Sequence, residues 1–318
     1  MTRFGKPLHA LLWAALIVAF GVRAEASAVA GDPFKVDRVI LLDIQRAGAN
    51  LFSAGEHGWI LRSDNDGADW QALRTPADRT LTGLAFENNQ VGVAVGHGAT
   101  LLRTADGGAH WSVIPLEGIG RDSLLGVTYL GDRRFVAYGA FGHYLESLDG
   151  GLSWMRRQIL NEDFDRHISK VLKAGDRLFL FGESGTLLRS VDFGASWEPL
   201  ESPYEGSFFG GLATPGGTLL AFGMRGNLYR STDAGASWAP VPIDSKAALQ
   251  GGQVLPDGRI VLVGNAGLLA VSCDDGRSFV LHKGGRGSLA QVAAAADGVL
   301  AVGDSGIQAL GLTSSAAN

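Results

Sequence analysis

Short apolar runs alternate with glycine-bounded polar turns along most of the chain, as in the segments 100–103 and 227–230. These runs are too short, and glycine bounds them too closely, for amphipathic helices, so β-strands are predicted. In one unit we expect an inner strand at 123–130, a second at 133–139, a third at 143–147 and an outer strand at 154–159. The pattern therefore indicates an all-β chain of short antiparallel strands.

The strand pattern repeats with a period of about forty residues. Each repeat carries a pair of glycines after an apolar run, and the leading glycines lie at positions 55, 96, 139, 182, 223, 264 and 303. This period matches one four-stranded propeller blade, whereas the residue pattern excludes helical solenoids of similar period. The sequence therefore predicts a seven-bladed β-propeller of four-stranded antiparallel blades within residues 32–318.

A second motif, Ser/Thr-x-Asp-x-Gly-x-x-Trp, follows the glycine pair in each of the first six repeats, with Asn65 replacing the aspartate once and Phe279 replacing the tryptophan once. In such an Asp box the carboxylate can accept bonds from backbone N–H groups, the glycine can take a positive φ, and the ring can pack onto the sheet. We expect the tryptophans to be mostly buried. The residues assigned this structural role are Asp106, Trp111, Asp149, Trp154, Asp192, Trp197, Asp233, Trp238 and Asp274.

The seventh repeat has no Asp box and shows no outer strand of its own. We expect residues 34–36, ahead of a first inner strand at 39–44, to pair there as an N-terminal strand and close the ring, which removes an open sheet edge. No change in composition marks a linker. Residues 27–318 are therefore interpreted as a single seven-bladed propeller domain.

Residues 1–26 have the pattern of a secretory signal peptide. Arg3 and Lys6 precede an apolar run at 8–22, and residues 24–26 have the small-x-small spacing of a cleavage site. Cleavage after this segment would release a periplasmic protein with no direct membrane insertion. An uncleaved membrane anchor is the alternative, although the run is shorter than the ~20 residues of a spanning helix.

Charge and cysteine content narrow the possible partners. The chain carries 27 Lys and Arg against 32 Asp and Glu, a formal net charge of −5, so it lacks the basic surplus that neutralises nucleic-acid phosphates. No nucleic-acid partner is expected. The single cysteine, Cys273, excludes an intramolecular disulfide and a zinc site built from several thiolates.

The full repeat reads Val-Gly-x-x-Gly-x-Leu-Leu-Arg-Ser/Thr-x-Asp-x-Gly-x-x-Trp and follows a signal peptide. In this it resembles the photosystem II stability/assembly factor-like propellers, an Asp-box group also called BNR-like. Photosynthetic members of that family are lumenal, non-enzymatic assembly factors. Relatives in other bacteria are exported, and some are encoded beside exporters of the RND class. The resemblance implies a non-photosynthetic bacterial member: an exported scaffold, without catalytic residues or cofactors, that helps to assemble or stabilise a membrane or cell-envelope protein complex, for example an RND-type exporter.

Asp boxes also occur in sialidases, so a glycan-binding or glycoside-cleaving propeller is one alternative function. A soluble periplasmic protein that binds a metabolite is another. The sialidase-type Arg-Ile-Pro signature is absent, and the adjacent Tyr204 and Glu205 would point to opposite faces of a strand. His57, His97 and His143 recur near the glycine turns of three consecutive blades, but equivalent positions of neighbouring blades are too far apart for one metal ion. We expect solvated turn histidines and no metal site.

Four arginines share one position of the repeat. We expect their stems to cover the sheet and their guanidinium groups to reach water or the neighbouring blade rather than a ligand. They are Arg62, Arg103, Arg189 and Arg230.

The longest connections between blades mark a candidate partner-binding surface. We compared the stretches of chain that run from the aromatic residue of one box to the leading glycine of the next repeat. The two longest, at 28 residues each, end at the second strands of blades 3 and 4. These connections open on the propeller face that also carries the turns between second and third strands. Mixed charge around exposed aromatic residues suits protein binding. The predicted partner-binding residues are His97, Phe141, Arg156, Arg157, Phe164, Arg166, His167 and Glu183.

Overall fold

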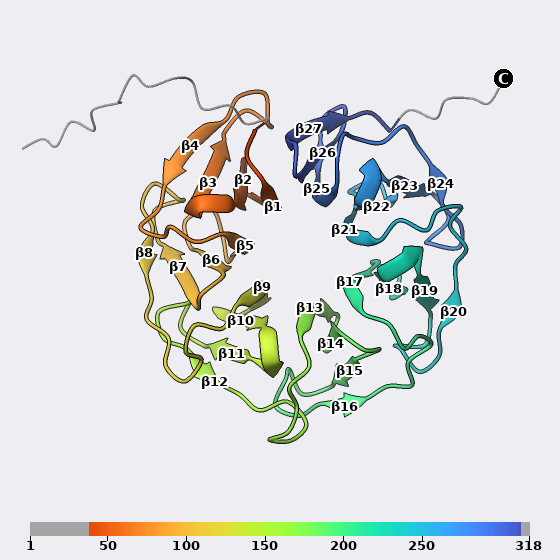
Figure 1. The fold of residues 1–318 in the computed structure, drawn as a ribbon, viewed down its shortest axis with the longest axis horizontal. Coiled ribbons are helices and arrows are strands. Elements are labelled where there is room, and N and C mark those ends of the chain that lie inside the picture. The colour runs from red at the N-terminus through yellow and green to blue at the C-terminus, as the bar shows by residue number, and fades with distance from the viewer. Residues whose placement is uncertain (1–37, 313–318) are drawn as a thin grey trace, which may run out of the picture. The chain divides into compact units, whose positions relative to one another are not determined.

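The computed structural model describes residues 38–312, which form seven β-sheets around a central axis (Figure 1). Six sheets have four strands and one has three, and within each sheet the strands are adjacent in chain order and antiparallel. This is the predicted all-β, seven-bladed propeller. The signal-peptide segment at 1–26 and the closing segment at 34–36 lie outside the described residues.

The sheets are numbered here as blades 1 to 7 in chain order, and in each blade the first strand lies nearest the axis (Figure 1). Blades 1 and 2 consist of β1 (Leu41–Ala47), β2 (Asn50–Gly55), β3 (Trp59–Ser63), β4 (Gln71–Arg74), β5 (Leu81–Phe86), β6 (Gly92–Gly96), β7 (Thr100–Thr104) and β8 (Ser112–Val113). Blades 3 and 4 consist of β9 (Leu124–Gly131), β10 (Arg134–Gly139), β11 (Tyr144–Ser147), β12 (Met155–Arg156), β13 (Ile168–Ala174), β14 (Arg177–Gly182), β15 (Leu187–Ser190) and β16 (Glu198–Pro199).

Short 3-10 turns join the second and third strands of four blades, and none of the described helical turns is long and apolar enough to cross a membrane. These turns are η1 (Glu56–Gly58), η2 (Ala140–Gly142), η3 (Met224–Gly226) and η4 (Asn265–Gly267). Blades 5 to 7 consist of β17 (Phe208–Ala213), β18 (Leu219–Gly223), β19 (Leu228–Ser231), β20 (Ala239–Pro240), β21 (Leu249–Val254), β22 (Ile260–Gly264), β23 (Leu269–Ser272), β24 (Val280–Leu281), β25 (Leu289–Ala295), β26 (Gly298–Gly303) and β27 (Gly306–Leu310).

Each inner strand has a bulge at its second residue, opposite the leading glycine of the repeat. In blade 1, Leu41 pairs with Gly55 and Asp43 pairs with Ala54, so the residue between them is extra. A Cβ on Gly55 would overlap the carbonyl oxygen of Ile40, and an equivalent overlap would occur at all seven leading glycines. The φ of Gly55 is −172°, which any residue can adopt. The repeat therefore needs glycine here for space.

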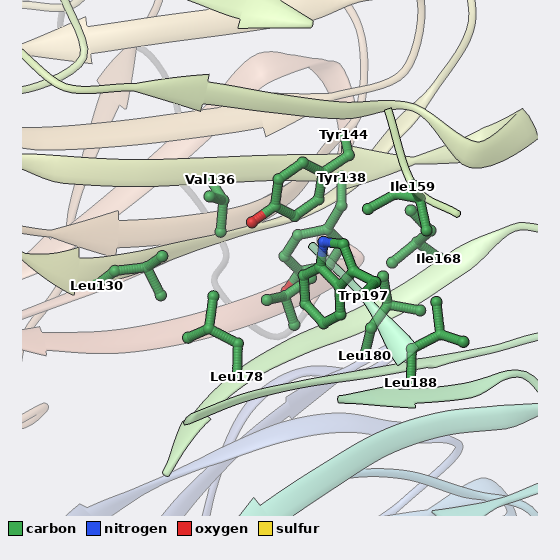
Figure 2. Packing of buried hydrophobic residues seen from close by; sticks show 11 residues of the cluster. Leu130, Val136, Tyr138, Tyr144, Ile159, Ile168, Leu178, Leu180, Leu188 and Trp197 are labelled. Atoms are coloured by element: carbon green, nitrogen blue, oxygen red, sulfur yellow. The ribbon is translucent and has the colours of Figure 1, made fainter. Parts of the chain in front are cut away.

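The hydrophobic core lies between neighbouring blades. Figure 2 shows the cluster between blades 3 and 4, where Tyr144 of blade 3 packs edge-on against Trp197 of blade 4 with ring centroids 5.8 Å apart. Tyr138, Ile168 and Leu178 belong to the same buried cluster. Because each sheet is covered by its neighbours, a change in the core of one blade also alters the packing of the next.

Two strand predictions need correction. The outer strand predicted at 154–159 is only the two-residue β12. Its partner β11 begins at Tyr144, and the Arg157 N–H donates to the Tyr144 carbonyl at 2.8 Å. Beyond Arg157 the outer strand therefore has no partner residue left in β11. The sequence predicts the first inner strand at 39–44, but β1 begins at Leu41 and its pairing with β2 continues to Ala47. Both differences arise from where the partner strand begins or ends.

The first and last blades contact each other within the described residues. Strand β1 packs against β25 and β26. Arg46 Nη2 donates to the Ala294 carbonyl at 2.9 Å, and the Ala296 N–H donates to Asp66 Oδ2 at 2.9 Å. Blade 7 has three strands between residues 38 and 312, so the pairing of its outer edge with 34–36 stays a prediction.

Candidate protein-binding rim

The Asp boxes join the third and fourth strands and are held by their own hydrogen bonds. In blade 5, Ser231 Oγ donates to Asp233 Oδ1 at 2.8 Å and accepts from the Gly235 N–H at 2.9 Å. Asp233 also accepts from the N–H and the hydroxyl of Ser237, at 2.9 and 2.5 Å. Gly235 has a φ of 82°. The predicted turn chemistry is confirmed, and these carboxylates already have their partners within the turn.

The same bonds keep the box carboxylates ionised. Donation from the hydroxyl and then the N–H of Ser237 lowers the pKa of Asp233 to about 2, and Ser196 lowers the pKa of Asp192 to about 2 in the same way. In the first box Asn65 replaces the carboxylate with an amide, and its Oδ1 accepts in the same manner. The pKa is also lowered to about 2 for Asp106, Asp149 and Asp274.

The four box tryptophans expected to be buried fall into two groups. Trp111 and Trp197 are 7% and 8% exposed, whereas Trp154 and Trp238 are only half-buried. The indole N–H of each half-buried ring donates to the carbonyl of its box glycine at 3.1 Å, which keeps one ring edge near the surface. The two buried rings pack against other aromatic rings, and their Nε1 atoms have no acceptor in the described structure.

The arginines of the shared repeat position connect successive blades. Arg103 Nε donates to the carbonyl of Gly150 at 2.7 Å, and Arg189 Nη1 of blade 4 donates to the carbonyl of Ala234 in blade 5 at 3.0 Å. Arg230 donates to the carbonyl and the carboxylate of Asp275, at 2.8 and 2.6 Å. Each acceptor lies in the Asp box of the next blade. The expectation that these guanidinium groups reach a neighbouring blade is confirmed for three of the four arginines.

Blade 3 has Glu146 at this arginine position. Its carboxylate, 8% exposed, lies 3.1 Å from Arg134 Nε and 2.8 Å from Arg157 Nε. Arg134 in turn donates to the carbonyl of Phe193 in the next Asp box at 3.2 Å. Arg157, predicted only as a binding residue, therefore also supports the junction of blades 3 and 4. The one available signal in the sequence is a glutamate at a position that carries arginine in four of the other repeats.

Four predicted binding residues meet where blades 3 and 4 adjoin. Phe141 is 53% exposed at the tip of η2, where its φ is 51°. Its N–H donates to His167 Nδ1 at 3.4 Å, and the two rings meet edge-on with centroids 5.0 Å apart. His167 Nδ1 also lies 3.7 Å from the carboxylate of Glu183. The backbone carbonyl of Arg166 accepts the N–H of Gly142 at 2.9 Å, which ties the long connection to η2.

A pocket of about 360 Å³ shares Gly142 with this cluster and is also lined by Arg156, Arg157, Glu162 and Phe164. A Cβ on Gly142 would overlap the Phe164 carbonyl, so glycine allows the connection to approach η2. Arg156 is exposed and forms no ion pair with any residue from 38 to 312. We define the rim as Phe141, Arg156, Arg157, Phe164, Arg166, His167 and Glu183.

The histidines of the glycine turns have different surroundings. His97 is exposed, lines the central channel rather than the rim, and lies with Nδ1 2.9 Å from Ser123 Oγ. His143, expected to be solvated, is instead 4% exposed, and its Nε2 lies 2.8 Å from the carboxylate of Asp122 in the connection between blades 2 and 3. His57 is exposed. No group of three or more possible metal ligands occurs in the described range.

Comparison with protein families connects this region to a known group. The family model described as photosynthesis system II assembly factor YCF48 matches residues 121–280, half of the 318-residue chain. The chain belongs to this family. The matched residues run from just before β9 into β24, so they span blades 3 to 6 and include the whole rim defined above.

Solved structures of YCF48 have the same fold. A structure of YCF48 bound to D1 peptide aligns over 85% of this chain and 92% of its own, with 19% identity and a TM-score of 0.67. YCF48 from Cyanidioschyzon merolae aligns over 85% and 95%, with 16% identity and a TM-score of 0.71. The WD40 propeller domain of Doa1 aligns over 86% and 93%, with 10% identity and a TM-score of 0.69. No curated protein matches the sequence significantly.

Proposed function

We propose that this YCF48-family protein is a non-catalytic scaffold that binds a segment of another protein and helps to assemble or stabilise a membrane protein complex. The description of its family as an assembly factor supports the assembly role. A solved YCF48 propeller with a bound D1 peptide supports a peptide segment as the bound species. The observation that carries the proposal is the rim, where an exposed aromatic ring and an unpaired guanidinium group flank a pocket.

Phe141 is the anchor of this proposed interface. The left-handed φ of Phe141 belongs to the turn itself, because the equivalent residues Ser184 and Arg225 share it. What sets this position apart is a large aromatic ring at an exposed turn tip. The edge contact with His167 orients the ring and still leaves 53% of the residue exposed. A ring that is already oriented loses little side-chain entropy on binding, which is a property of interface hot spots.

The charges of the rim favour a particular kind of segment. Arg157 is held by a buried carboxylate, whereas Arg156 has a free guanidinium group at the pocket. Guanidinium groups bind carboxylates through paired, charge-assisted hydrogen bonds. A segment with an apolar side chain next to a carboxylate therefore fits best, with the apolar group against Phe141 and Phe164 and the carboxylate on Arg156.

We further propose that the protein acts in the cell envelope. The signal-peptide pattern at 1–26 supports export to the periplasm. Within the envelope, a complex of the RND exporter class is the first specific partner to examine, on the basis of the repeat resemblance.

Affinity purification from the native envelope with mass spectrometry tests the rim. The test variant is Phe141→Ala with Arg156→Glu, and the matched control is Arg225→Ala, which changes the equivalent turn tip of blade 5, where φ is 58°. The test variant should lose the co-purified partner while its stability changes by less than about 1 kcal/mol, as for surface substitutions. The control should retain the partner.

Two outcomes would overturn the proposal. A folded test variant that still co-purifies its partner would exclude the rim as the binding surface. Turnover of fluorogenic glycosides that is abolished by a carboxylate substitution would replace the scaffold with the glycan-cleaving alternative.

A further inference from the structure

The central channel contains a second pocket, distinct from the rim. It has a volume of about 350 Å³ and is lined by inner strands of all seven blades, with His97 among its lining residues. From every blade, the bulge residue of the inner strand and the residue after it line this pocket. A volume in this range suits a small molecule.

The residue after the bulge has a structural explanation in six blades. In four blades the residue after the bulge is glycine, as at Gly210. At each of these four positions a Cβ would come within 3.0 Å of a neighbouring atom, so there is no space for a side chain. In blade 1 the carboxylate of Asp43 accepts the N–H of Leu84 from blade 2 at 2.8 Å. In blade 7 the Oε1 of Gln291 accepts the N–H of Gly252 from blade 6 at 3.0 Å. These residues fill or bridge the space between adjacent inner strands.

Lys170, at this position in blade 4, has no such explanation. It is half-buried, lines the pocket, and makes no hydrogen bond or ion pair with any residue between 38 and 312. The charge of Asp43 acts on it through space, but that carboxylate already accepts bonds from Ile44, Gln45 and Leu84. The three N–H donors of the ammonium group therefore face the pocket without a protein acceptor.

We propose that the channel pocket binds a small hydroxylated organic carboxylate, with Lys170 holding the carboxylate. Ser169 Oγ and Gln291 Nε2 line the pocket and donate to no described residue, so they are further donors for the ligand. The side-chain carbonyls of Gln45 and Gln250 are free acceptors for ligand hydroxyl groups. One ammonium group matches a single carboxylate, whereas phosphate sites normally combine several N–H donors or arginine. This site is independent of the proposed scaffold function.

Isothermal calorimetry with the full protein tests the site with a matched pair of probes. Gluconate carries a carboxylate where sorbitol carries a hydroxymethyl group, and the two are otherwise alike. The protein should bind gluconate and not sorbitol, and gluconate should raise the Tm. Lys170→Met should weaken gluconate binding about tenfold or more, whereas Lys170→Arg, which keeps the positive charge, should retain it.

An exposed lysine provides the control. Lys246→Met, in the connection between β20 and β21, removes the same charge away from the channel and should leave gluconate affinity unchanged. Equal affinity of the unsubstituted protein and Lys170→Met would overturn the proposal, as would sorbitol binding equal to gluconate binding. A failure of gluconate, glucuronate and citrate to bind at millimolar concentration would also overturn it. Partner co-purification should persist in Lys170→Met, so failure of this site and failure of the rim are distinguishable.

Discussion

At the scale of single residues, the Asp-box carboxylates couple folding to protonation. Hydrogen bonds from Ser237 lower the pKa of Asp233 to about 2 in the folded protein. An aspartate in an unfolded chain has a pKa near 3.9, so folding favours the ionised form. The contribution to stability is therefore fully present above about pH 4 and is lost as the pH falls through about 2.

Replacement of one box aspartate by asparagine tests this dependence. The first box shows that an amide fits, because Asn65 Oδ1 accepts from the Ser63 hydroxyl and the Asp69 N–H at 2.9 Å. Asp233→Asn has no carboxylate to protonate, so its Tm should lie below that of the unsubstituted protein near neutral pH. The difference should shrink between about pH 4 and about pH 2. Thermal unfolding followed by circular dichroism measures it, and a difference independent of pH would contradict the prediction.

At the scale of elements, the six box turns share one sequence pattern but not one depth of burial. Trp197 is 8% exposed and packs against Tyr144, whereas Trp238 is half-buried and bonds to the Gly235 carbonyl. Trp197→Ala should lower the free energy of unfolding by about 3–5 kcal/mol, and Trp238→Ala by less, because part of its ring already contacts water. Trp197→Phe should cost much less than Trp197→Ala, since its Nε1 has no acceptor to lose. Urea denaturation measures all three, and equal losses in the two alanine variants would contradict the prediction.

Local chemistry explains which elements the sequence could predict. The strand order, the glycine turns and the Asp-box bonds depend on residues a few positions apart, so one repeat contains all the information for them. The end of β12 depends instead on where β11 begins, and the depth of Trp197 depends on Tyr144 in another blade. Such features require the packing between strands and blades, which the repeat pattern does not contain.

At the scale of the whole molecule, the same distinction applies to the candidate site. The long connections predicted the rim by position, and Phe141, His167 and Glu183 do lie together. The pocket beside Arg156 arises only when the connection between blades 3 and 4 folds over η2. The contact of His143 with Asp122 likewise needs the connection between blades 2 and 3 to reach the same turn. The pairing of Arg157 with the buried carboxylate of Glu146 depends instead on the contact between β11 and the chain at the end of β12. Loop length can therefore locate a surface, but not the contacts within it.

The last prediction concerns how firmly neighbouring blades are joined. Arg230, with a side chain 14% exposed, links blade 5 to Asp275 in the Asp box of blade 6 and also donates to Thr218 at 3.1 Å. Arg62 occupies the same repeat position in blade 1 but forms no such bond with residues 38–312. Arg230→Met should lower the free energy of unfolding by about 1–3 kcal/mol, whereas Arg62→Met should change it by about 0.5 kcal/mol or less.

The shape of the urea transition then reports on the ring. If the blades unfold together, Arg230→Met should lower the midpoint and leave the slope unchanged, because the same surface becomes exposed in one step. A reduced slope in Arg230→Met alone would mean that the broken junction lets blades unfold separately. Equal midpoint shifts in both variants would show that the bond to Asp275 contributes nothing beyond the packing of the arginine stem, and would contradict its role in joining blades 5 and 6.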